Sequence, residues 1–220
     1  MAEALPHVVH ALIFDMDGVL ADTEPIFYQA TVAAITPHRM TLEDYERFIG
    51  TDGLEEWLAE TYGFPLDLID THIIPTYFEA IGQSLPAFPG AVEVIEAALA
   101  RGLKIAVASM SGHRSIELTL TSAGLRHYFP LVVSGSDVGR GKPAPDIYLH
   151  TARVLGIAPE HCLVIEDSVH GIEAAVAAGM RVVQSRQATF VPPPQASAYA
   201  VIESLEAFNL AWLDGDALGG

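Results

Sequence analysis

The sequence contains one cysteine, Cys162, among 220 residues. A single thiol forms no internal disulfide, and one cysteine gives no zinc-binding pattern, so nothing indicates an oxidising compartment or a structural zinc site. Cys162 also begins an apolar run, residues 162–165, in which a buried structural thiol is a better interpretation than a reactive one.

Basic residues are scarce as well. The chain has 11 Lys and Arg against 28 Asp and Glu, which gives a formal net charge of −17. Without a Lys/Arg cluster no basic face can neutralise a phosphate backbone, which excludes a nucleic-acid-binding domain. Half of the residues are apolar, whereas chains that stay unfolded are poor in apolar residues and highly charged. The sequence therefore predicts a folded acidic protein.

Long apolar runs are also lacking. No stretch of about 18 apolar residues is free of charge, glycine and proline, so no membrane-spanning helix is predicted. The first ten residues carry Glu3 and neither Lys nor Arg, which is not the pattern of a secretory signal. We expect a cytoplasmic protein, a monomer or weak dimer, that binds neither nucleic acid nor membrane.

What the chain does contain is a recurring short apolar run of the kind that forms buried parallel strands. Five such runs alternate with segments of helical spacing, which predicts an α/β fold, a doubly wound parallel sheet with helices on both faces. The predicted strands are residues 8–14, 103–108, 131–133, 163–165 and 181–184. The predicted helices are residues 91–101, 115–123, 146–155, 172–178 and 204–213.

Residues 22–88 differ because they contain no strand-like run. Four segments in them have helical spacing, which predicts an all-helical cap domain inserted after the first strand. These segments are residues 24–35, 42–49, 54–62 and 66–82. The core domain would then comprise residues 1–21 and 89–220, with hinges near residues 21–22 and 86–90. The cap holds 12 acidic and 2 basic residues, and therefore −10 of the net charge.

The clearest chemical signal is Asp15-Met16-Asp17-Gly18, placed directly after the first predicted strand. In a parallel α/β sheet, ligands bind at the carboxyl ends of the strands. A carboxylate there can attack phosphorus and ligate a hard cation, and a second one two residues later can transfer protons. Gly18 would let the backbone turn and approach a phosphate. The alternative is an Asp-Gly turn with solvated carboxylates.

Three further signals follow other predicted strands or loops. Ser109 ends an apolar run before a helix, where it is either a phosphate ligand or simply an N-cap. Lys142 lies in a Gly-Lys-Pro loop and is either presented to a site or solvated. Glu166 and Asp167 follow another predicted strand, where they form either a magnesium site or an exposed acidic loop.

Taken together and in this order, the signals resemble the haloacid dehalogenase superfamily, in particular its helical-cap subfamily, which includes phosphoglycolate phosphatases and β-phosphoglucomutases. The resemblance extends from about residue 8 to residue 213. It rests on Asp-x-Asp-Gly-Val-x-x-Asp-Thr-Glu, the serine after the second strand, Gly-Lys-Pro-x-Pro-Asp and Glu-Asp-Ser-x-x-Gly.

The resemblance implies a role for each matching residue. Asp15 would be the nucleophile that forms an aspartyl-phosphate, and Asp17 the general acid and base. Mg²⁺ would be held by Asp15, the carbonyl of Asp17 and Asp167, with Glu166 as a ligand or beside the ligands. The substrate phosphate would be bound by Asp15, Gly18, Ser109, Met110 and Lys142. Such neutralisation of phosphoryl oxygens is the main requirement of phosphoryl transfer.

Within the family, the residues favour a phosphatase. Dehalogenation needs no second aspartate, because halide leaves unprotonated, yet Asp17 is present. A hexose phosphate mutase usually carries a histidine and cap cations where this chain has Phe27, Ile49-Gly50 and Gly53. A mutase and a phosphoglycolate phosphatase remain alternatives, as does a catalytically silent binding module.

The acidic cap favours a neutral or cationic leaving group, such as a sugar or polyol, although the acidic residues could simply face solvent. The candidates for contacts between cap and substrate, each also compatible with packing or surface positions, are Thr51, Asp52, Trp57, His72 and Tyr77.

Overall fold

The computed structural model describes residues 8–48 and 53–214. Its core is a sheet of six parallel strands in the order β3-β2-β1-β4-β5-β6. The strands are β1 (Ala11–Phe14), β2 (Lys104–Ser109), β3 (Val132–Ser134), β4 (Cys162–Glu166), β5 (Arg181–Ser185) and β6 (Ala200–Ile202). The predicted doubly wound sheet is confirmed, and β1 lies in its middle.

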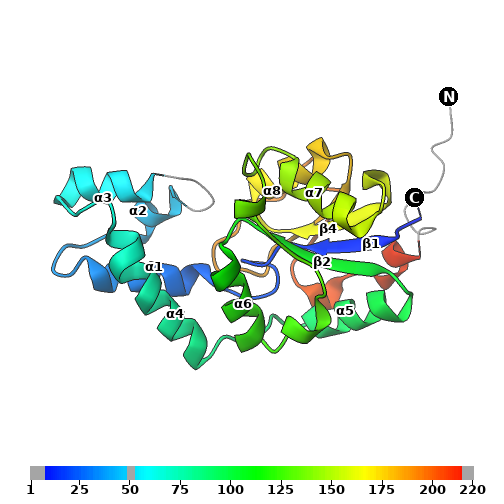
Figure 1. Cartoon of the computed structure of the whole chain (residues 1–220), viewed down its shortest axis with the longest axis horizontal. Coiled ribbons are helices and arrows are strands. Elements are labelled where there is room, and N and C mark those ends of the chain that lie inside the picture. Colours follow the sequence, from blue (N-terminus) through cyan, green and yellow to red (C-terminus); the bar gives the residue numbers. More distant parts are fainter. Residues whose placement is uncertain (1–7, 49–52, 215–220) are drawn as a thin grey trace.

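Helices cover both faces of the sheet, as the unbroken apolar character of β1 requires. Leu12 and Phe14 point into one apolar cluster, which α5 (Ala91–Ala100) covers. Ala11 and Ile13 point into the other, beneath α7 (Asp146–Leu155) and α8 (Val169–Ala177). Figure 1 shows α5 on one side of the sheet and α7 and α8 on the other.

The parallel register brings the ends of three strands together. Phe14, the last residue of β1, is paired with Val107 of β2 and Ile165 of β4. The amide of Asp15 then donates to the carbonyl of Ile165 at 2.9 Å. The residues that follow β1, β2 and β4 therefore leave the sheet at one edge, where sites form in this class of fold.

A helical cap follows β1. It consists of α1 (Glu24–Ala34), α2 (Leu42–Glu46), α3 (Leu54–Tyr62), a π-helical turn (Ile69–Ile73) and α4 (Ile74–Gln83). These elements share an apolar cluster of their own, centred on Ile35, Leu58, Ile73 and Ile81. Figure 1 places α1–α4 at the end of the molecule opposite to the start of β1. The boundaries at residues 21/22 and 88/89 stay predictions.

The cap is joined to the core by two linkers, by one helix and by the loop that carries Phe190, whose ring centre lies 6.2 Å from that of Tyr45. The linkers run side by side, because the amide of Phe88 donates to the carbonyl of Leu20 at 2.9 Å. Core helix α6 (His113–Ser122) lies along α4, and Ser122 Oγ donates to the carbonyl of Ile81 at 2.6 Å. At the other end of this contact, the guanidinium of Arg114 lies 4.8 Å from the ring centre of Phe78.

One expectation for the C-terminal part was wrong, and one strand there was not predicted. Residues 204–213 do not form one helix but two 3-10 turns, Leu205–Ala207 and Leu210–Leu213. The side chains of Ser204 and Asn209 accept hydrogen bonds from the amides of Glu206 and Ala211, and such local bonds compete with a continuous helix. The three-residue strand β6 was not expected, because so short an edge strand leaves little pattern.

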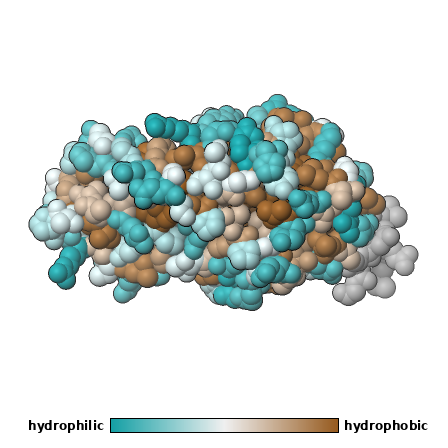
Figure 2. All heavy atoms as spheres, turned by 90° about the horizontal axis from the view of Figure 1, so that it is seen from below, coloured by the Kyte–Doolittle hydropathy of each residue, from teal (hydrophilic) through white to brown (hydrophobic). Residues whose placement is uncertain are grey.

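Two expectations about the surface and interior can also be compared with the structure. Cys162 is buried, and burial raises the pKa of its thiol to about 12, which confirms a structural residue. No helix in the described part of the chain is long and apolar enough to cross a bilayer. The face in Figure 2 mixes hydrophilic and hydrophobic residues over both cap and core.

Candidate active site

A buried lysine joins the acidic residues of two strand ends. Lys142 Nζ, from the loop before α7, donates to Asp15 Oδ1 at 2.5 Å and to Glu166 Oε1 at 2.7 Å. All three side chains are less than 10% exposed. The hydroxyl of Tyr148 donates to the same oxygen of Glu166 at 3.1 Å. The alternatives of a solvated lysine and an exposed acidic loop are therefore wrong for these residues.

Both carboxylate oxygens of Glu166 accept hydrogen bonds. Its Oε2 accepts hydrogen bonds from the amide and hydroxyl of Ser168, at 2.8 and 3.0 Å. The same hydroxyl accepts from the amide of Gly171 and so caps α8. A Cβ on Gly171 would lie 1.5 Å from Glu166 Oε1, so only glycine leaves room for this carboxylate. Both oxygens of Glu166 are thus engaged, one of them with Lys142.

Asp17 is oriented by three hydroxyl groups. Thr23 Oγ1 donates to its Oδ1 at 2.6 Å, while Ser109 Oγ and Ser111 Oγ donate to its Oδ2 at 3.0 and 2.8 Å. Ser109 therefore does not cap the next helix, whose N-cap is Gly112. Ser111 was not among the predicted site residues; its only signal in the sequence is a second small hydroxyl side chain two residues after the predicted phosphate ligand Ser109.

Gly18 and Asp167 are in close contact. Gly18 has a φ of +78°, a conformation that favours glycine, and an added Cβ would lie 2.1 Å from Asp167 Oδ2. The Gly18 amide donates to the carbonyl of Ala21 at 2.9 Å. The role of Gly18 is therefore to leave room for the Asp167 carboxylate. Its amide is already hydrogen-bonded to Ala21 and is not free to bind a phosphate.

The acidic groups raise one another's proton affinity. Burial raises the pKa of Asp15 to about 8, against the opposing charge of Lys142 and with further increases from Glu166 and Asp17. Burial, Glu166 and Asp15 likewise raise the pKa of Asp167 well above its usual range. Burial raises the pKa of Glu166, but the charge and hydrogen bond of Lys142 and the hydrogen bonds from Ser168 together outweigh it, so the pKa of that carboxyl is lowered. One lysine therefore leaves this site short of positive charge.

The donor set fits a hard divalent cation. Carboxylate and carbonyl oxygens are the ligands that Mg²⁺ prefers, and a cation would stabilise the charged forms of Asp15 and Asp167. Within residues 8–48 and 53–214, no three His, Cys, Asp or Glu side chains gather into a complete metal site. The resemblance implies that Asp15, Asp167 and the backbone carbonyl of Asp17 would hold the cation, with Glu166 as a ligand or beside the ligands.

The remaining candidates are placed differently. Met110 is 44% exposed and lies beside Ser109 at the end of β2, with its Cε over Gly135 and Gly141. Tyr77 is buried against Phe27, with ring centres 5.4 Å apart. Trp57 packs against Phe48 and Tyr62, and His72 is exposed beside Thr71. Thr51 and Asp52, like Ile49 and Gly50, lie outside the described residues.

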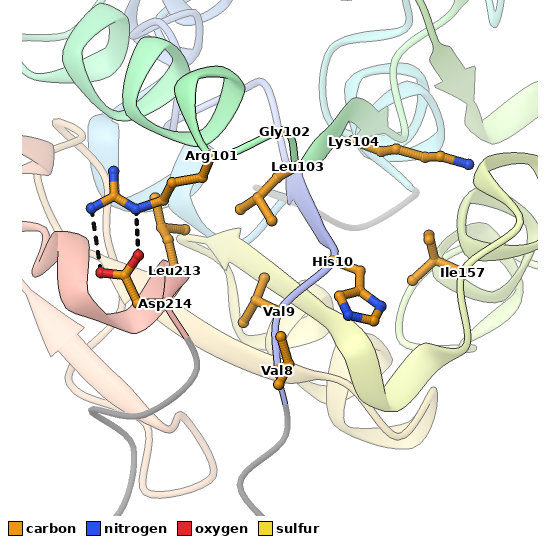
Figure 3. Close-up of a pocket in the computed structure, with 10 residues that line it drawn as sticks. All are labelled: Val8, Val9, His10, Arg101, Gly102, Leu103, Lys104, Ile157, Leu213 and Asp214. Atoms are coloured by element: carbon orange, nitrogen blue, oxygen red, sulfur yellow. Dashed lines mark hydrogen bonds and ion pairs between the residues drawn. The ribbon is translucent and has the colours of Figure 1, made fainter.

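A hollow of about 460 Å³ lies at the other edge of the sheet, where β1 and β2 begin (Figure 3). Its lining includes His10, Lys104 and the Arg101–Asp214 ion pair, with Arg101 Nε 2.7 Å from Asp214 Oδ1. None of the predicted site residues lines it, so the chemistry gathered at the carboxyl ends of the strands is separate from this hollow.

This geometry agrees with what is known of similar proteins. A family model described as a haloacid dehalogenase-like hydrolase matches residues 9–179. The chain belongs to that family. The match covers most of the chain and spans Asp15, Ser109, Lys142 and Asp167 together, and the predicted resemblance to the helical-cap subfamily is confirmed.

Individual relatives of this haloacid dehalogenase-like hydrolase are similar to it over most of its chain. The phosphorylated carbohydrates phosphatase of Thermotoga maritima is 33% identical over 186 residues, which cover 78% of this chain and 82% of that protein. SUPPRESSOR OF QUENCHING 1, chloroplastic, of Arabidopsis thaliana is 37% identical over 184 residues, which cover 79% of this chain but 17% of that longer protein. The predicted enzyme class, a phosphatase, is confirmed by the family and its phosphatase relatives.

A solved structure has the same fold over nearly the whole chain. The crystal structure of CbbY from Rhodobacter sphaeroides in complex with phosphate is similar with a TM-score of 0.83 and 26% identity. The similarity covers 94% of this chain and 100% of that chain. It includes the cap as well as the core, which confirms the fold class.

Proposed function

We propose that this enzyme hydrolyses a small phosphate monoester of a sugar or polyol, through an aspartyl-phosphate on Asp15 and with Mg²⁺ as cofactor. The observation that carries the proposal is the buried Lys142 between Asp15 and Glu166, beside an Asp17 that three hydroxyls hold in place. These contacts support the proposed roles of Asp15 as nucleophile, Asp17 as acid–base group and Lys142 as phosphate ligand.

The first half of the reaction uses both aspartates. A carboxylate oxygen of Asp15 attacks phosphorus, and the bond from phosphorus to the ester oxygen breaks. Asp17 donates its proton to that oxygen, so that the leaving group departs as a neutral alcohol. Ser109, Met110 and Lys142 would bind the phosphoryl oxygens on which charge accumulates, and the Ser109 hydroxyl would turn to them from Asp17 once Asp17 carries its proton.

The second half releases phosphate. Asp17, now a carboxylate, accepts a proton from water, whose oxygen attacks the phosphorus of the aspartyl-phosphate and regenerates Asp15. Bound Mg²⁺ would neutralise charge on the phosphoryl group and on the nucleophile. Asp15, the carbonyl of Asp17 and Asp167 would hold it. Because both Glu166 oxygens already accept hydrogen bonds, we place Glu166 beside the metal ligands, where it orients Lys142.

The described cap supports hydrolysis over mutase activity. A mutase must bind a second phosphate with cap cations. Here Arg47 lies beside Glu43 and Asp44 of its own helix, and Phe27, at the place of the mutase histidine, packs against Tyr77. The name of the Thermotoga maritima relative supports a phosphorylated carbohydrate as substrate. Action in the cytoplasm, as a monomer or weak dimer, stays part of the proposal.

The test is phosphate release from para-nitrophenyl phosphate and from a panel of sugar and polyol phosphates, with Mg²⁺ and with EDTA. We expect Mg²⁺-dependent turnover that Asp15→Asn abolishes. Mg²⁺ should also raise the melting temperature of the wild type, and Asp167→Asn should reduce that rise. Turnover that is unaffected by Asp15→Asn, or no turnover of any ester, would contradict the proposal.

A further inference from the structure

A second group of polar side chains lies next to Asp17, on the cap side. It consists of Glu24, the first residue of α1, Tyr45 on α2 and Tyr77 on α4. The hydroxyl of Tyr45 donates to Glu24 Oε2 at 2.6 Å. Tyr45 and Tyr77 are 3% and 5% exposed, so both phenols are buried although they belong to different cap helices.

These three side chains share one space with the acid–base group. Thr23, the residue before Glu24, donates to Asp17 at 2.6 Å. Burial raises the pKa of Tyr77, and the charge of Asp17 raises it further. Hydrogen bonds of its hydroxyl with the side chains of Ser115 on α6 and of Thr23 lower it. The Tyr77 hydroxyl therefore lies near Thr23, whose own hydroxyl contacts Asp17, on the side of Asp17 that faces the cap.

The space is acidic and holds no cation of its own. Burial raises the pKa of Glu24 to about 7, the Tyr45 hydrogen bond opposes this, and Asp17 and Asp22 add to the increase. No Lys or Arg within residues 8–48 and 53–214 is among the charges that act on Glu24. Since Tyr45 engages Oε2, the oxygen Oε1 is the acceptor left for a ligand.

A carboxylate acceptor and two phenols suit one kind of ligand. Hydroxyl groups can donate to Glu24 and accept from tyrosine, whereas a carboxylate or second phosphate would be repelled by Glu24 and Asp17. A half-buried carboxylate that merely anchored α2 could be replaced by an amide at lower desolvation cost. Its position beside Asp17 indicates a part in substrate selection.

We propose that Glu24 is a specificity-determining residue that accepts a hydrogen bond from a hydroxyl of the leaving group, next to the oxygen that Asp17 protonates. Tyr45 positions the Glu24 carboxylate through its hydrogen bond, and Tyr77 on α4 would contact the same leaving group. The inference rests on the proposed phosphatase function and narrows it: the accepted leaving group carries a free hydroxyl near the ester oxygen and no negative charge there.

The test compares Glu24→Gln with the wild type at pH 8 with Mg²⁺. The probes are sorbitol 6-phosphate, which is rich in hydroxyls, phosphoglycolate, which carries a carboxylate, and para-nitrophenyl phosphate, which has no hydroxyl on the leaving group. Losing a hydrogen bond to a charged acceptor should lower kcat/KM for sorbitol 6-phosphate about 10- to 100-fold. For phosphoglycolate kcat/KM should rise, since a repelling charge is gone.

The exposed Glu46, next to Tyr45 on α2, provides the matched control. Glu46→Gln removes the same charge from the cap and should keep the ratio of kcat/KM for sorbitol 6-phosphate to that for phosphoglycolate. Tyr45→Phe keeps the ring and removes the hydroxyl that fixes Glu24, so it should lower the same ratio in the same direction. It replaces the Gln variant as the test if that variant does not fold.

The outcomes separate this inference from the function beneath it. An equal loss of kcat/KM on all three probes in Glu24→Gln would mean that Glu24 only supports the cap, and the inference would fall. A wild type that prefers phosphoglycolate would overturn it as well. A wild type without turnover on any probe would instead overturn the proposed function, and the inference with it.

Discussion

The hydroxyl of Thr23 lies 2.6 Å from Asp17 Oδ1, which joins the entrance of the cap to the aspartate that we propose as the acid–base group. The residues before and after Thr23 bind other parts of the molecule. Asp22 accepts a hydrogen bond from the hydroxyl of Thr189 on the core at 2.5 Å, and Glu24 accepts one from Tyr45 on the cap at 2.6 Å. Three consecutive residues therefore connect the core, the active site and the cap.

Replacing Thr23 by valine should lower kcat about tenfold with little change in KM, because Asp17 would lose one of three orienting hydrogen bonds, each worth about 1 kcal/mol or somewhat more. Steady-state kinetics with para-nitrophenyl phosphate would measure this. Thr119→Val is the control: this buried threonine lies on α6, and its hydroxyl has no partner in the described part of the chain. Wild-type kcat in Thr23→Val would show that the other hydroxyls suffice.

Replacing Gly18 by alanine should abolish metal-dependent activity. The new Cβ would lie 2.1 Å from Asp167 Oδ2, so the carboxylate would have to move. Gly102→Ala separates this clash from backbone strain, because Gly102 also has a positive φ, +71°, with no atom within 4 Å of an added Cβ. We expect that control to lose only about 1 kcal/mol of stability and to stay active. Mg²⁺ titrations by calorimetry would show whether Gly18→Ala weakens metal binding.

Replacing Lys142 by glutamine should destabilise the metal-free protein by about 3–5 kcal/mol at pH 8, because Asp15 and Glu166 would lose their buried counter-charge. Without Lys142 the pKa of both carboxyls rises, so they protonate as the pH falls and the penalty shrinks toward pH 5. Urea denaturation with EDTA at both pH values would measure this. Arg140→Gln, which breaks an exposed ion pair in the same loop, should cost less than about 1 kcal/mol.

Replacing Glu24 by glutamine should stabilise the protein at high pH. The folded pKa of about 7 lies above the ordinary value of 4.5, so the folded state favours the protonated carboxyl. The wild type therefore loses stability as the pH rises from 4.5 through 7, whereas glutamine does not titrate. The difference should be on the order of 3 kcal/mol at pH 8 and close to zero at pH 4.5. A Glu24→Gln variant less stable than the wild type at pH 8 in urea denaturation would contradict this.

Much of the fold could be predicted because the buried strands are short apolar runs with sharp ends. The strand ends at Phe14 and Glu166 were placed within a residue, and the parallel register then brings Asp15, Ser109 and Asp167 to one edge. The C-terminal helix was predicted wrongly, because the amphipathic spacing of residues 204–213 does not reveal that Ser204 and Asn209 bind the backbone locally.

The sequence by itself determined the order of the chemistry: an acidic pair after the first strand, then a serine, a lysine and a second acidic pair. Tertiary structure alone decided which of these groups are in contact and how their pKa values are shifted. Lys142 reaches Asp15 across 127 residues, and Tyr45 reaches Glu24 across 21. Such contacts follow from the packing of the cap and the sheet rather than from local spacing. Burial in that packing, which removes water from the carboxylates, raises the pKa values of Asp15 and Glu24.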